Sequence, residues 1–382
     1  MNKYSEDSLI EQPTKQLFAE LGYEVMDCLD EVVGENATLG RETYRDVVLV
    51  PRLREAIERL NPNLPIESID TAVRELTKDR SALHPTIANK EVYALLKHGV
   101  ATSIRTSDGS IRGQNVKVID WDTPANNDFF LASQFWVAGD LGKKRPDLIG
   151  FINGLPLVFI ELKALHVSAK DAYDKNLSDY KDTIPHLFWY NALTILSNGT
   201  ESRIGTISSA WEHFVEWPKI NSEGESRAVS LETMIRGTCE KTRLLDIVEN
   251  FTLFTDAFGS PTKILAKNHQ FLGVNNAIQA EMEEAASKWG VKLTRVEVQD
   301  ISMPEEVEEA MRLQMAAERK RRATVTEAEG EKSAAIAMAQ GQRESAILNA
   351  QGDKESAILR AQGEQESIRL VLSAMGDTEE NK

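Results

Sequence analysis

The chain has 382 residues, of which 41% are hydrophobic, so it is long enough for two or three globular domains and too apolar for wholesale disorder. Its formal net charge of −16 excludes nucleic-acid binding through the overall charge and leaves only local basic patches for that task. Cys28 and Cys239 stand outside any CxxC pattern, which excludes a disulfide scaffold and a zinc ribbon and suits a reducing compartment. No apolar run approaches the roughly 20 residues of a membrane span, and the polar first residues do not resemble a signal peptide. We therefore expect a cytoplasmic protein with no transmembrane segment.

The first elements of the chain are predicted to be helices. Apolar spacing indicates an amphipathic helix over residues 8–21, which Gly22 would end, and two further helices over residues 52–60 and 71–77. From about residue 101 the pattern favours strands, which we place at residues 116–121, 129–137, 147–154 and 155–163.

A hairpin and a further helix–strand unit follow. Asn153-Gly154 separates two apolar runs and predicts a tight turn, because two-residue hairpin turns need positive φ. A helix over residues 169–180 and a buried strand within residues 191–199 come next. This order predicts an α/β domain with a mixed central sheet flanked by helices.

The last part of the chain has a different composition and an internal repeat. Four copies of an eleven-residue unit begin at residues 328, 339, 350 and 361. The first three carry an Ala-Ile pair, at 335/336, 346/347 and 357/358, which with Leu348 and Leu359 forms one stripe of a helix. Each copy also carries a glycine, which costs a helix on the order of 1 kcal/mol. A single helix weakened in this way needs its stripe buried against another chain, so we expect a coiled coil that makes homo-oligomers.

The residues with most chemical information are Asp147, Glu161 and Lys163. Positions 161 and 163 face the same side of a strand, and the predicted hairpin brings Asp147 to the same end. Two converging carboxylates can hold a hard cation such as Mg²⁺, and a neighbouring amine can orient a water or offset charge on a phosphate. The alternative is a set of surface charges at a strand end.

The stretches around these residues resemble a known family. They are SEDSLIEQP (5–13), KKRPDLIGFINGLPLVFIELK (143–163), DYKDTIPHLFWYNALTILSNG (179–199), NFTLF (250–254) and KILAKNHQFLGVNNAI (263–278). They resemble the N-terminal PD-(D/E)xK endonuclease domain of the type I restriction enzyme restriction subunit, over roughly residues 3–278. The resemblance implies a Mg²⁺-dependent hydrolase that cleaves phosphodiester bonds of double-stranded DNA, with methylation and specificity subunits as partners.

The resemblance also implies roles for single residues. Asp147 and Glu161 would be metal ligands, Lys163 the catalytic lysine, and Glu11 an extra acid that could join the metal site. The family carries a Gln-x-x-x-Tyr element after the lysine, and here Tyr180 matches whereas Asn176 replaces the glutamine. Asn176 and Tyr180 would act on DNA or as supporting residues.

Basic residues and a nucleotide-binding residue are further candidates. Lys143, Lys144 and Arg145 could contact a DNA backbone, with a solvated turn as the alternative. Gln270 matches the family's entrance to an ATP-driven motor, where it would contact adenine. ATP is thus implied by the family, but no G-x-x-x-x-G-K-[ST] sequence occurs, so we do not expect ATP-driven translocation and interpret Gln270 as vestigial.

Residues 281–375 resemble a second family. The runs VEVQDISMPEEVEEAM (296–311) and QMAAERKRRA (314–323) resemble the end of a stomatin/prohibitin (SPFH) domain and its coiled-coil extension, which implies ring or filament assembly. We therefore divide the chain into four parts. These are a nuclease domain (1–254), a linker that resembles the start of the missing motor (255–280), the end of an SPFH-like domain (281–303) and a coiled-coil helix with a polar tail (304–382).

Two functions follow from these patterns. The first is a type I restriction-like endonuclease that lacks the motor and is assembled through a coiled coil. The second is a non-catalytic oligomeric SPFH-like scaffold that carries a vestigial nuclease domain. Binding of Mg²⁺ would separate the two.

Overall fold

The structure is a computed structural model that describes residues 10–105, 111–255, 261–289 and, between 338 and 370, all but residues 339, 340, 344 and 347. It divides into two compact units, residues 1–296 and 297–382, and each is described by itself. Predictions for the first nine residues and for residues 290–337 lie outside the described ranges.

A mixed six-stranded sheet forms the centre of the first unit. Its strands are β1 (Glu24–Asp27), β4 (Phe129–Ser133), β7 (Leu148–Ile152), β8 (Leu155–Leu162), β9 (Leu193–Ser197) and β10 (Ser202–Gly205), side by side in that order. The pairs β1–β4 and β8–β9 are parallel and the other three are antiparallel. All residues of β4, β7, β8 and β9 are buried, as expected for strands covered on both faces. The predicted α/β domain with a mixed sheet is confirmed.

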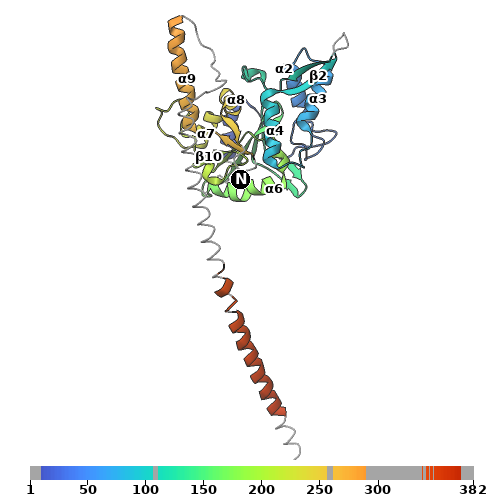
Figure 1. The fold of residues 1–382 in the computed structure, drawn as a ribbon, viewed down its shortest axis with the longest axis vertical. Coiled ribbons are helices and arrows are strands. Elements are labelled where there is room, and N and C mark those ends of the chain that lie inside the picture. The colour runs from blue at the N-terminus through green and yellow to red at the C-terminus, as the bar shows by residue number, and fades with distance from the viewer. Residues whose placement is uncertain are drawn as a thin grey trace, which may run out of the picture. The chain divides into compact units, whose positions relative to one another are not determined.

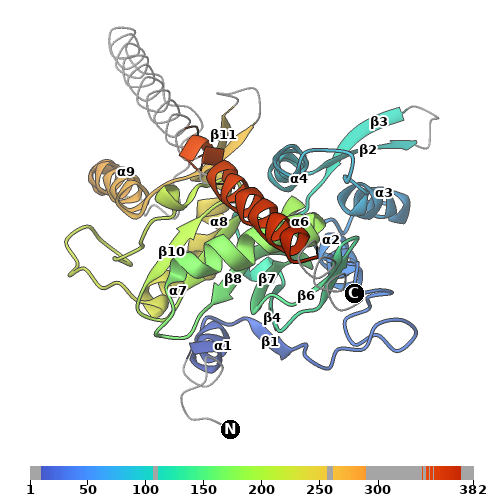
Figure 2. The ribbon, with the colours of Figure 1, turned by 90° about the horizontal axis from the view of Figure 1, so that it is seen from below.

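Helices and small hairpins surround this sheet (Figure 1). The helices are α1 (Gln12–Glu20), α2 (Val50–Leu60), α3 (Ile66–Thr77), α4 (Pro85–His98), α5 (Ala169–Asp171), α6 (Ser178–Thr183), α7 (Leu231–Thr238), α8 (Lys241–Asn250) and α9 (Asn268–Trp289). The hairpins are β2–β3 (Val100–Arg105, Ile111–Val116), β5–β6 (Val137–Gly139, Gly142–Lys144) and β11–β12 (Thr252–Thr255, Thr262–Leu265). Figure 2 shows α1 beside β1 at one edge of the sheet.

Local sequence explains several of these elements. Gly22 has φ +81 at the end of α1, so the predicted stop is confirmed. Asn153 and Gly154 have φ +51 and +75 and close the β7–β8 hairpin as predicted. The helix expected over residues 169–180 runs from α5 through a π-helical segment (Ala172–Leu177) into α6.

Two strand predictions are corrected by the structure. In the segment 116–121 only Val116 lies in a strand, because the Asn61 side chain binds the backbone N–H and C=O of Lys117 and takes the place of a strand partner. The segment 129–137 is two strands, because Gln134 has φ +54 and turns the chain between β4 and β5.

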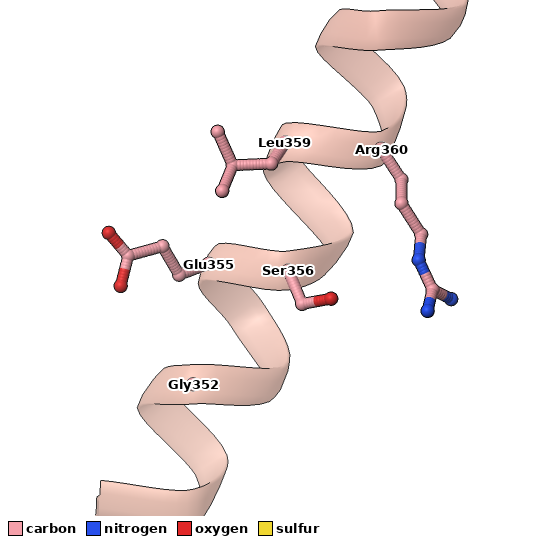
Figure 3. A pocket seen from close by; sticks show the side chains of 5 residues that line it. All are labelled: Gly352, Glu355, Ser356, Leu359 and Arg360. Atoms are coloured by element: carbon pink, nitrogen blue, oxygen red, sulfur yellow. The ribbon is translucent and has the colours of Figure 1, made fainter.

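In the second unit, residues 348–370 form an uninterrupted helix, and every described residue of this unit is exposed. Gly352, Glu355, Ser356, Leu359 and Arg360 line a shallow depression on successive turns of this helix (Figure 3). The described part of the predicted repeat helix is thus confirmed. The predicted coiled-coil pairing needs a second chain and stays a prediction. None of the helices in the described ranges combines the length and apolar character that a membrane crossing requires.

Candidate active site

The candidate site lies where several strands of the central sheet end. The pairs Asp27–Ser133, Ser133–Leu148 and Leu148–Ile160 form one row across β1, β4, β7 and β8 (Figure 2). Asp147 and Glu161 each lie one position beyond the Leu148–Ile160 pair. Because opposite residues of an antiparallel pair project to the same side, the sheet brings these two acids together, as the sequence predicts.

Backbone and side-chain hydrogen bonds hold these groups in place. The backbone N–H of Leu162 donates to Asp147 Oδ2 at 2.7 Å, which fixes the direction of that carboxylate. The Glu161 side chain is 2% exposed, and Lys163 Nζ lies 3.1 Å from Glu161 Oε1. Glu161 and Lys163 therefore share one side of the strand end, as predicted from their spacing.

Tyr180, on α6, faces the same two acids. Burial raises the pKa of its hydroxyl well above the usual range, and the charges of Glu161 and Asp147 raise it further. The phenol therefore stays protonated, and its Oη donates to the carbonyl of Arg145 at 3.4 Å. The Asn176 side chain lies close enough to the Tyr180 hydroxyl to act against this rise in its pKa.

Glu11 lies in the π-helical turn that runs directly into α1 and reaches the site through residues that the sequence patterns did not indicate. Gln134 Nε2 donates to Glu11 Oε2 at 2.7 Å, and Lys15 Nζ lies 3.3 Å from Glu11 Oε1. Lys15 also pairs with Asp27 at 3.1 Å. The sequence signal for this contact is the polar pair Ser133-Gln134 in the middle of the mostly apolar run FFLASQFWV.

Three basic residues precede Asp147 closely in the chain, Lys143, Lys144 and Arg145, and each contacts a different partner. The Lys143 ammonium lies 4.0 Å from the centre of the Tyr44 ring, and the Arg145 guanidinium lies 5.1 Å from that of Trp136. Lys144 forms an ion pair with Asp179. Lys143 and Arg145 are exposed, so they can reach a phosphate close to the acids.

The chain matches two known protein families. Residues 3–213 match the family described as "Type I restriction enzyme R protein N terminus". The chain belongs to this family. Residues 229–332 match the "SPFH domain / Band 7 family", and that match begins within the first compact unit.

Individual relatives agree with both matches. The Type I restriction enzyme HindI endonuclease subunit of Haemophilus influenzae is 35% identical over 289 residues, which are 73% of this chain and 27% of the relative. The putative type I restriction enzyme MjaIXP endonuclease subunit of Methanocaldococcus jannaschii is 28% identical over 299 residues, which are 72% and 28%. The human mitochondrial stomatin-like protein 2 is 44% identical over 57 residues, which are 15% and 16%. The chain thus spans about a quarter of the length of the endonuclease subunits that it matches.

The donor chemistry of the site fits the magnesium ion that such a restriction-subunit domain implies. Mg²⁺ is commonly held by one or two carboxylates, with waters and substrate phosphates completing its shell. Asp147 and Glu161 supply two carboxylates whose charges both act on the Tyr180 hydroxyl. Within the described ranges no three His, Cys, Asp or Glu side chains gather closely enough to hold an ion between them, so a bound ion would need waters or phosphate as further ligands.

Gln270 lies apart from this arrangement of strand ends. It is exposed in the first turn of α9, and its Oε1 accepts a hydrogen bond from the backbone N–H of Lys267 at 2.9 Å. Here the glutamine side chain caps the start of a helix, which satisfies a backbone donor that the helix itself leaves unpaired.

Proposed function

We propose that this chain carries a Mg²⁺-dependent endonuclease domain of PD-(D/E)xK type that cleaves double-stranded DNA as part of a type I restriction system. The observation that carries this proposal is the placing of Asp147 opposite Glu161 at one end of the sheet, with the Lys163 amine 3.1 Å from Glu161. Family membership supports restriction as the biological setting.

In this proposal Asp147 and Glu161 would hold the ion. When bound, Mg²⁺ supplies a Lewis acid that offsets negative charge on the phosphodiester and its leaving oxygen. The Leu162 N–H holds the Asp147 carboxylate in place, so that the ligand is oriented before DNA binds.

Lys163, Lys143 and Arg145 would act on the DNA through their positive charges. The Lys163 ammonium can orient the attacking water and attract a phosphate oxygen, because its side chain is 16% exposed while its partner Glu161 is buried. Lys143 and Arg145 would contact neighbouring phosphates, which are the contacts that position a duplex. Tyr180 would hold the Arg145 backbone through its hydroxyl.

The proposal also covers the partner subunits and the need for ATP. We infer that sequence recognition comes from methylation and specificity subunits, as expected for this family. The printed sequence has no G-x-x-x-x-G-K-[ST] loop, so we propose that cleavage by these 382 residues needs Mg²⁺ and no ATP.

The test is cleavage of supercoiled plasmid with MgCl₂ and without ATP. We expect Asp147→Asn and Lys163→Ala to lower the rate by at least about 100-fold, the scale of losing a group that acts on the reacting atoms. Lys175→Ala is the matched control, because Lys175 is a lysine with a 73% exposed side chain on the π-helical segment after α5. Equal rates for the parent and both site variants would remove these residues from the mechanism.

A second candidate is a non-catalytic scaffold, and the exposed helix of residues 348–370 favours it. Leu348, Ile358, Leu359, Ile368 and Leu370 are between 46% and 62% exposed there, which is unfavourable for a helix that stays single. Absence of Mg²⁺ binding in calorimetry, together with stable oligomers, would support the scaffold and contradict the nuclease.

A further inference from the structure

The turn between β4 and β5 contains an unusual backbone conformation next to the candidate metal site. Gln134 has φ +54, a left-handed value that non-glycine residues seldom adopt. It is one of two described non-glycine residues with positive φ, and the other, Asn153, belongs to a turn type that requires it. A strained residue persists where its surroundings hold it, and such residues concentrate at functional sites.

Gln134 connects two parts of the site through its backbone and its side chain. Its backbone N–H donates to the carbonyl oxygen of Asp147 at 2.9 Å. Its side-chain Nε2 donates to Glu11 Oε2 at 2.7 Å. The same residue therefore links the turn before α1 to the residue that immediately precedes β7.

Glu11 is itself held from two directions. Its residue is 6% exposed, its Oε2 accepts from Gln134, and its Oε1 lies 3.3 Å from Lys15 Nζ. Lys15 also contacts Asp27 at 3.1 Å and Ser133 Oγ at 3.5 Å. Burial opposes the charge on Lys15, but hydrogen bonds and the charges of Asp27 and Glu11 raise its pKa overall, so the amine stays protonated beside Glu11.

We propose that Gln134 is a positioning residue for Asp147, and that Glu11 acts through Gln134 instead of binding the ion directly. Among the described residues, Glu11 does not gather with Asp147 and Glu161 closely enough for the three to hold one ion, and both Glu11 oxygens have donors nearby on Gln134 and Lys15. The glutamine in turn holds the backbone of the residue that carries the metal-binding carboxylate. The inference rests on the proposed function, because it gives Gln134 a task only if Asp147 binds the ion.

The test compares Mg²⁺ affinity, measured by calorimetry with MgCl₂, and plasmid cleavage across four variants of the full chain. Gln134→Gly keeps the left-handed turn without strain and removes the amide. Gln134→Glu places a second carboxylate against Glu11. We expect both to lower Mg²⁺ affinity on the order of 10-fold, the usual cost of losing a residue that orients a ligand.

An exchange variant separates positioning from general damage. Glu11→Gln combined with Gln134→Glu restores the hydrogen bond with its direction reversed, and the new amide oxygen still accepts from Lys15. We expect this exchange to return the Mg²⁺ affinity to within about threefold of the parent, as a coupled pair should. Asn153→Gly is the matched control, since it changes the other left-handed residue at the opposite end of β7. We expect it to alter stability and not affinity.

Different results would contradict the positioning role of Gln134 and the proposed nuclease function. Parent-like affinity and cleavage in Gln134→Gly, or an exchange variant no better than Gln134→Glu alone, would overturn the inference and leave the nuclease intact. A parent that neither binds Mg²⁺ nor cuts DNA would overturn the proposed function and this inference with it.

Discussion

Arg41 Nη1 lies 2.7 Å from Glu31 Oε2, and neither side chain is exposed to solvent. The guanidinium also lies 3.9 Å from the centre of the Phe135 ring and donates to the Trp136 carbonyl at 2.7 Å. This buried pair therefore fastens the connection between β1 and α2 to the residues that follow Gln134. The connection between β1 and α2 therefore contacts the residues next to the Gln134 turn.

Removal of one partner of this pair should be strongly destabilising. We expect Arg41→Met to lower the free energy of unfolding by about 3–5 kcal/mol, because it leaves Glu31 as an uncompensated buried charge. Arg41→Met with Glu31→Leu should recover part of that loss, because it removes the buried charge but leaves the carbonyls of Asp46, Tyr44 and Trp136 without their Arg41 donor. Urea unfolding followed by circular dichroism measures both. The control is Arg45→Met, which removes an exposed ion pair with Asp140 and should cost at most about 1 kcal/mol. A cost for Arg41→Met as small as that of Arg45→Met would contradict the expectation.

Lys263 should make stability depend on pH. It is 2% exposed on β12, and its Nζ donates to Asn89 Oδ1 at 3.1 Å and to the Asn191 carbonyl at 2.6 Å. Burial lowers its pKa from 10.5 to about 7. Between these values the unfolded chain binds more protons than the folded one, so the stability of the parent rises with pH across this window and is lost as pH falls toward 7.

The measurement is urea unfolding of the parent and Lys263→Met between pH 6.5 and 10. We expect the difference between their free energies of unfolding to move in favour of the parent by up to about 4 kcal/mol, at about 1.4 kcal/mol for each unit of the window covered. Burial raises the pKa of neighbouring Tyr93 to about 12, so its hydroxyl stays protonated in the folded chain across the range tested. Parallel pH profiles would show that the Lys263 amine does not titrate in this window.

Lys143 and Arg145 should contribute to DNA affinity through charge. We expect Lys143→Ala with Arg145→Ala to weaken duplex binding and to reduce the slope of log K against log salt concentration by about 2, one for each phosphate that the variant no longer neutralises. Fluorescence anisotropy of a labelled duplex in EDTA, at several KCl concentrations, measures the slope without cleavage. Lys175→Ala is again the control for removing an exposed positive charge. An unchanged slope in the double variant would place these two residues outside the DNA interface.

The C-terminal helix should set the oligomeric state. We expect deletion of residues 303–382 to lower the number of subunits, because it removes the exposed apolar side chains of residues 348–370 that a second copy would cover. Light scattering measures the mass of the parent and the deletion variant. The same number of subunits in both would contradict this expectation.

Some features of this fold could be predicted because they depend on neighbours in the chain. Asn153-Gly154 closes the β7–β8 hairpin since both residues accept the positive φ that the turn requires, and alternation along β8 puts Glu161 and Lys163 on one side. The buried runs of β7, β8 and β9 were equally clear, as continuous apolar stretches bounded by turn residues. The prediction for residues 116–121 failed because the decisive partner, Asn61, lies 56 positions away in the chain.

The contacts that join Glu11, Lys15 and Gln134 were decided by the tertiary structure. Glu11 and Gln134 are separated by 123 positions, and no periodicity or spacing connects them. They meet because β1 pairs with β4 and β4 with β7, which carries the turn before α1 to the strand end that holds Asp147. A strand pattern specifies which residues are buried, but the choice of neighbouring strand is decided by packing of the whole core. That choice placed Gln134 against the backbone of Asp147, with Glu11 on the Gln134 side chain and Lys15 on Glu11.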